Sequence, residues 1–117
     1  MNEFLLIFRQ VEAPGAEKPS PEQMQSTMKL WMDWLGSIAA QNKLVSNGNR
    51  LYGGTGSVVR PGEVVTNGPY VEIKELIGGY SIIKADSLEE ATEISKGCPI
   101  LRVGGNVEVR QIVPMDM

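Results

Sequence analysis

The sequence predicts a single α+β domain over residues 1–117, with elements in the order β-α-β-(hairpin)-β-α-β. Three observations predict it. Short apolar or alternating segments are typical of strands, two serine-capped apolar stripes are typical of helices, and Gly- and Pro-rich turns separate them. This order matches the split βαβ pattern called ferredoxin-like, an antiparallel four-stranded sheet with two helices on one face.

The first predicted strand is the apolar segment 4–8. A strand this apolar is typical of one covered on both faces. Because two helices cover only one face of the sheet, we expect a second copy of the chain to cover the other face, in a symmetric homodimer.

The first predicted helix begins after Ser20, an N-cap, with Pro21 in its first position and Gln23 completing a capping box. It runs to about Gln41. Its apolar stripe is expected in the core and consists of Met24, Met28, Trp31, Leu35 and Ile38. Trp34 flanks the stripe and is a candidate ligand-binding residue.

The middle of the chain is rich in turn signals. Asn47 and Gly48 predict a turn, and residues 50–60 then predict a short or bent strand. Residues 60–63 predict a tight turn, after which residues 64–66 pair back as a hairpin.

The second half repeats the strand and helix pattern. Residues 71–76 predict either a short strand or one helical turn, and residues 80–85 predict a clear strand. Ser87 and Glu90 form a second capping box at the start of the second helix. The last strand is predicted over residues 106–113.

The composition excludes several kinds of site. The chain has no histidine, which removes histidine-based triads and histidine-ligated metals, and its one cysteine cannot form a disulfide or a thiolate zinc site. We therefore expect no metal or cofactor. A net charge of −3 argues against a nucleic-acid partner. Without a membrane-length apolar run or a basic leader, a cytoplasmic location is expected.

Residues 66–80 read TNGPYVEIKELIGGY. This segment resembles the signature of the YCII-related proteins called DGPF-domain proteins, which is Asp-Gly-Pro-Phe, then Glu, Lys-Glu, Gly-Gly and an aromatic. Here Asn67 and Tyr70 replace the Asp and the Phe at unchanged spacing. Three further segments, 86–91, 98–99 and 107–110, resemble the same family, and the resemblance covers nearly the whole chain, from the opening strand to Val113.

The resemblance implies a dimeric α+β barrel. The family mostly lacks an established reaction, and some members look like companions of extracytoplasmic-function sigma factors, which implies a regulatory setting. The broader group includes proteins with a His–Asp pair proposed as catalytic. That role cannot be carried over to a chain without histidine.

Glu108 and Arg110 are two residues apart on the last strand and share a face, with Val107 and Val109 on the other. We expect the valines to meet the helices and the charged pair to face a cavity on the dimer side. The pair is either a structural bridge or a ligand clamp. Arg110 is the better ligand-binding candidate because a guanidinium binds carboxylates bidentately.

The motif segment carries further candidates. Glu72 is a candidate general base, and Lys74 is a candidate catalytic amine or ligand-binding cation. The alternative is a surface ion network with Glu75 or a dimer contact. Tyr70 either shapes its turn or presents its hydroxyl to a pocket. Cys98 is expected to be an inert thiol.

Two functions remain open. The first is a small-molecule-binding or regulatory homodimer without turnover, whose ligand is a small anion. The alternative is a cofactor-free lyase or isomerase, in which Glu72 or Glu108 moves a proton while Arg110 or Lys74 holds an anionic substrate. The lack of histidine favours the first.

Overall fold

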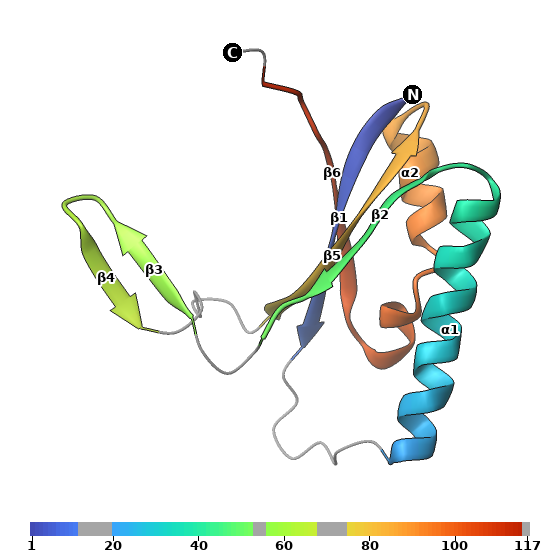
Figure 1. Cartoon of the computed structure of the whole chain (residues 1–117), viewed down its shortest axis with the longest axis horizontal. Coiled ribbons are helices and arrows are strands. Elements are labelled where there is room, and N and C mark those ends of the chain that lie inside the picture. The colour runs from blue at the N-terminus through green and yellow to red at the C-terminus, as the bar shows by residue number, and fades with distance from the viewer. Residues whose placement is uncertain (12–19, 53–55, 68–74, 116–117) are drawn as a thin grey trace.

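The computed structural model describes residues 1–11, 20–52, 56–67 and 75–115 (Figure 1). Its elements are β1 (Asn2–Val11), α1 (Pro21–Ala40), β2 (Leu44–Arg50), β3 (Ser57–Arg60), β4 (Val64–Asn67), β5 (Glu75–Ala85), α2 (Leu88–Ser95), the 3-10 helix η1 (Pro99–Val103) and β6 (Asn106–Gln111). The predicted α+β class is confirmed. Neither described α-helix is long and apolar enough to cross a membrane.

The main sheet has the strand order β2-β5-β1-β6, and its neighbouring strands are antiparallel. Both helices lie on the same face of it (Figure 1). Side chains alternate along a strand, so β1 directs Phe4, Leu6 and Phe8 toward the helices, and Leu5 and Ile7 toward what we call the open face. The three helix-facing side chains are at most 6% exposed.

The core lies between the sheet and the two helices. Its members share near-complete burial and come from every layer: Phe4, Leu6, Phe8, Trp34, Ile38, Ile83, Ala85, Ala91, Cys98 and Ile100. Val107 and Val109 of β6 pack against this cluster, as their predicted orientation requires.

The capping box predicted at the start of α1 is confirmed. Ser20 Oγ accepts a hydrogen bond from the Gln23 N–H at 3.1 Å, and Gln23 Oε1 accepts one from the Ser20 N–H at 2.8 Å. The expected burial of Met24 and Met28 is wrong, because they are 55% and 63% exposed. The N-terminal turns of α1 extend beyond the end of the sheet and so have no strand to pack on (Figure 1).

The N-cap predicted for the second helix is confirmed, with Ser87 Oγ accepting from the Glu90 N–H at 3.1 Å, but the Glu90 side chain does not complete the predicted capping box. The Glu90 carboxylate instead lies 2.8 Å from Lys43 Nζ, and this ion pair lowers the pKa of Glu90. The chain after Pro99 forms η1, which the sequence did not predict. Proline blocks an α-helix interior but fits a first helical turn.

The predicted turn at Asn47 and Gly48 is wrong, because both residues lie within β2. The register against β5 shifts between Ser46 and Asn49, and Gly48 adopts a φ of 69° inside this irregularity. Ser46 Oγ accepts a hydrogen bond from the Gly48 N–H at 3.0 Å. A turn-like dipeptide therefore forms a bulge in a strand.

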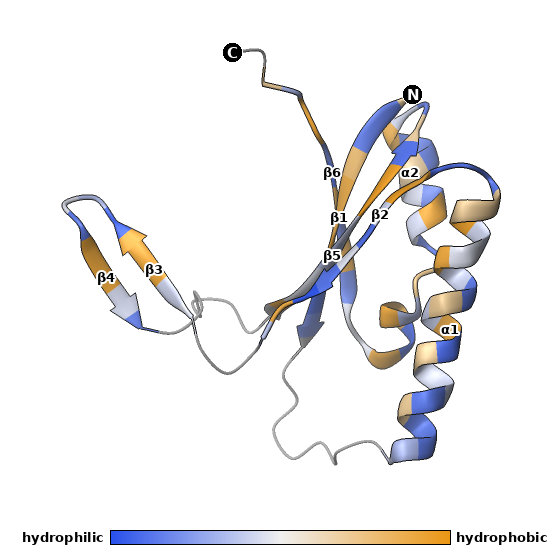
Figure 2. Cartoon of the chain, viewed as in Figure 1, coloured by the Kyte–Doolittle hydropathy of each residue, from blue (hydrophilic) through white to orange (hydrophobic). Residues whose placement is uncertain are grey.

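The strand expected over residues 50–60 is also wrong as a single element, because β2 ends at Arg50 and β3 begins at Ser57. Within the described part of the chain, the strands β3 and β4 pair only with each other, as the predicted hairpin, around a turn in which Gly62 and Glu63 have positive φ. Figure 1 shows the hairpin projecting from the body, and Figure 2 shows apolar residues on both of its strands.

Candidate functional site

A cavity of about 580 Å³ opens between α1 and the ends of β1, β2 and β5, with η1 at its side. We call it the α1 groove. Its apolar wall consists of Phe8, Met24, Met28, Trp31, Leu35, Ile100 and Val103. Its polar side includes Gln10, Thr27, Asn47, Asn49 and Arg50. The volume and the mixture of an apolar wall with a few polar groups are those of small-molecule sites.

An aromatic cluster supports the groove wall. The Trp31 ring meets the Phe8 ring edge-on at a centroid distance of 4.9 Å, and Trp34 lies 5.8 Å from Trp31 at an interplanar angle of 80°. Trp34 is 8% exposed, and its Nε1–H donates to the Ile94 carbonyl at 3.1 Å. The structure therefore places Trp34 in the core behind the groove, whereas Trp31 is half-buried and lines it.

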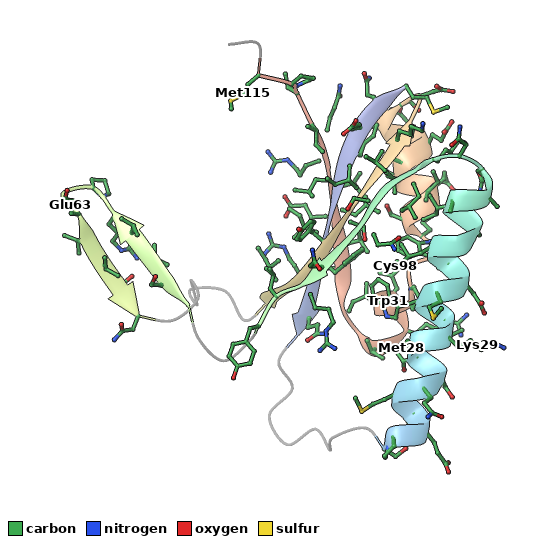
Figure 3. The ribbon with its side chains drawn as sticks, in the orientation of Figure 1. Met28, Lys29, Trp31, Glu63, Cys98 and Met115 are labelled. Atoms are coloured by element: carbon green, nitrogen blue, oxygen red, sulfur yellow. The ribbon has the colours of Figure 1, made fainter. Side chains whose placement is uncertain are left out.

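The tight packing of Trp34 explains this arrangement. A Cβ atom added to Gly97 would lie 3.2 Å from the Trp34 ring, so the end of α2 approaches that ring closely. The buried face of α1 is thus centred on Trp34 and Ile38. The face carrying Trp31 and Met28 turns toward the groove (Figure 3).

Arg50 is the one charged side chain among the described residues that line the groove. It pairs with Gly79 of β5, which in turn pairs with Phe8 of β1, so Arg50 lies on the helix-facing side of the sheet. No described carboxylate forms an ion pair with it. Among the residues that the structure describes, the groove thus combines an apolar wall with a positive charge that no carboxylate pairs.

The predicted pair of Glu108 and Arg110 lies on the other side of the sheet, on the open face. Glu108 Oε2 lies 3.1 Å from Arg110 Nη1, and its Oε1 lies 3.0 Å from Arg9 Nη2. Hydrogen bonds from Arg110 and then Arg9 hold the pKa of Glu108 below its ordinary value. Both carboxylate oxygens are occupied, so Glu108 is a weak proton acceptor. Arg9 was not predicted from the sequence, because its contact with Glu108 joins two neighbouring strands that are far apart along the chain.

Three of the candidate residues, Tyr70, Glu72 and Lys74, lie outside the residues that the structure describes. Their roles as pocket hydroxyl, base and cation stay predictions. Cys98 is described and is 2% exposed, and burial raises the pKa of its thiol to about 11. Because the thiolate is the reactive form, this thiol is suited to packing rather than to chemistry at neutral pH.

Comparison with known proteins identifies a family. No curated protein matches the chain. The model of the YCII-related domain matches residues 4–116, which is nearly the whole sequence. The segments that resembled this family in the sequence, from the opening strand to the last, all fall within the match. The chain belongs to the family of YCII-related domain proteins.

Proposed function

We propose that this protein is a small-molecule-binding homodimer that holds its ligand in the α1 groove. The observation that carries the proposal is the groove itself, a cavity of about 580 Å³ with one apolar wall and one polar side. An apolar body gains from burial against such a wall, and a few polar groups then select its orientation.

The groups lining the groove favour binding over proton transfer. The polar side chains among its described lining residues are amides, hydroxyls and the Arg50 guanidinium. These groups neither gain nor lose a proton near neutral pH. Glu108 lies on the other side of the sheet with both oxygens hydrogen-bonded to arginines. The polar side chains of the groove can therefore hold and orient a ligand.

The composition of the open face supports the homodimer. Leu5, Ile7 and Ile82 carry apolar side chains on the open face, opposite the described helices, and each is only half-buried. The ion pairs of Glu108 with Arg9 and Arg110 lie beside them. A second copy packed face to face would remove the apolar groups from water under a two-fold axis.

The dimer is tested at Ile7, which lies on β1 between Tyr80 of β5 and Glu108 of β6. We expect Ile7→Asp to convert the dimer to a monomer, because a buried unpaired carboxylate opposes association. Light scattering after size-exclusion chromatography measures the mass. Met32→Asp is the control, since Met32 lies on α1 and is 66% exposed. A monomeric parent protein, or a folded Ile7→Asp dimer, would contradict the proposal.

The groove is tested with 2-naphthamide, a flat and uncharged probe, by calorimetric or NMR titration. We expect Met28→Asp to weaken its binding by about tenfold, because a carboxylate replaces an apolar wall contact. Met32→Asp again serves as the control, because Met32 does not line the groove although both methionines are similarly exposed, at 63% and 66%.

Two results would overturn this function. If neither 2-naphthamide nor 2-naphthoate, the carboxylate with the same ring, binds detectably, the groove is not a ligand site. If a bound compound is consumed when it is incubated with the protein, binding without turnover is wrong.

A further inference from the structure

We propose that the ligand of the α1 groove is a flat apolar carboxylate whose carboxyl group binds Arg50. The inference rests on the proposed function and adds to it the chemical class of the ligand and the residue that selects it. Three features of the groove carry it: its charge, its floor and its wall.

Among the described lining residues of the groove, a single arginine carries the charge. Arg50 is exposed, and none of the described lining residues is acidic. A guanidinium presents a planar fork of N–H donors that matches the two oxygens of a carboxylate. Neutral amides from Gln10 and Asn47 lie in the same groove and tolerate an anion. A cationic ligand would meet repulsion here and no described countercharge.

The floor of the groove is Gly79, which lies between Phe8 and Arg50 in the sheet. Neighbouring strands are about 4.8 Å apart, so the backbones at Phe8 and Arg50 are separated by roughly 10 Å. Glycine places no side chain between them. A Cβ on Gly79 would come within 2.8 Å of the Asn49 carbonyl oxygen, so the close strand approach itself favours glycine. A fused aromatic carboxylate spans this distance.

The wall above this floor suits a flat ring. Phe8 and Trp31 stand nearly perpendicular, at 78°, and together they offer a ring face and a ring edge. Met24 and Met28 add flexible thioethers that adapt to an aromatic ligand. The ring of the ligand is therefore expected against Phe8 and Trp31, with its carboxylate directed across Gly79 toward Arg50.

The experiment compares 2-naphthoate with 2-naphthamide, which share their ring and differ in charge. We expect the native protein to bind the carboxylate about tenfold to a hundredfold more tightly, the usual range for a hydrogen bond to a charged group. Arg50→Gln is expected to abolish this preference while amide binding persists. Arg50→Lys is expected to retain part of it, because an ammonium supplies charge but no fork.

Lys29→Gln is the matched control, because it removes the same charge from the opposite side of α1 (Figure 3). It is expected to leave the preference unchanged, and circular dichroism checks that each variant is folded. If both probes bind equally, or if Arg50→Gln keeps the preference, this inference fails while the proposed function stands. If neither probe binds, both fail.

Discussion

Replacing Gly48 with alanine is expected to lower the free energy of unfolding by roughly 3 kcal/mol or more. Two independent costs combine. Gly48 has a φ of 69°, in the left-handed region that disfavours a side chain. A Cβ there would lie 1.6 Å from the Tyr80 carbonyl oxygen, so β2 and β5 would have to move apart. Urea denaturation measures the loss.

Substitutions at two other glycines provide comparisons for these two costs. Gly62 has a φ of 83°, but a Cβ added there would have no neighbouring atom within 4 Å. Gly62→Ala therefore measures the conformational cost alone, about 1 kcal/mol. Gly36 lies within α1 in open space, where alanine is expected to stabilise the helix by about 1 kcal/mol. A Gly48→Ala variant as stable as Gly62→Ala would show that the bulge adapts without loss.

The elements that the sequence predicted well are those fixed by local chemistry. Ser20 and Ser87 act as N-caps where the capping patterns placed them. The turn at residues 60–63 closes the predicted hairpin. In each of these cases the decisive interactions join residues within a few positions of one another, so the local sequence is enough to predict the element.

The middle of the sheet could not be predicted in this way. Asn47 and Gly48 have the composition of a turn, and only the pairing of β2 with β5 makes them a bulge. A bulge also breaks the alternation of side chains along the strand. The sequence therefore could not assign Arg50 to the face that carries the groove, and the residue did not attract a functional prediction.

The groove itself depends on tertiary geometry. It exists because α1 continues beyond the end of the sheet, so that Met24 and Met28 overhang the strands rather than pack on them. Helix length and apolar spacing predicted the apolar stripe on α1. They did not predict that the sheet ends before the N-terminal turns of the helix. Tertiary geometry also decides which tryptophan is buried. Trp34 packs closely against Gly97, a residue far along the chain.

The buried tryptophan carries the second large expected effect. Trp34→Ala is expected to cost about 3–5 kcal/mol of unfolding free energy, because it removes a large core side chain and leaves a cavity beside Phe8. It also leaves the Ile94 carbonyl without its indole donor. Thermal and urea unfolding measure the loss, with Trp31→Ala as the comparison. Trp31 is half-buried and is expected to cost less stability.

The same pair of tryptophans distinguishes a core role from a ligand-binding role. Trp34→Phe keeps most of the buried ring and is expected to leave the affinity for 2-naphthamide unchanged, although stability falls with the loss of the indole hydrogen bond. Trp31→Ala is expected to weaken that affinity several-fold, because Trp31 lines the groove. If a folded Trp34→Phe variant loses affinity while Trp31→Ala keeps it, the ligand lies against Trp34 instead, as the sequence alone had suggested.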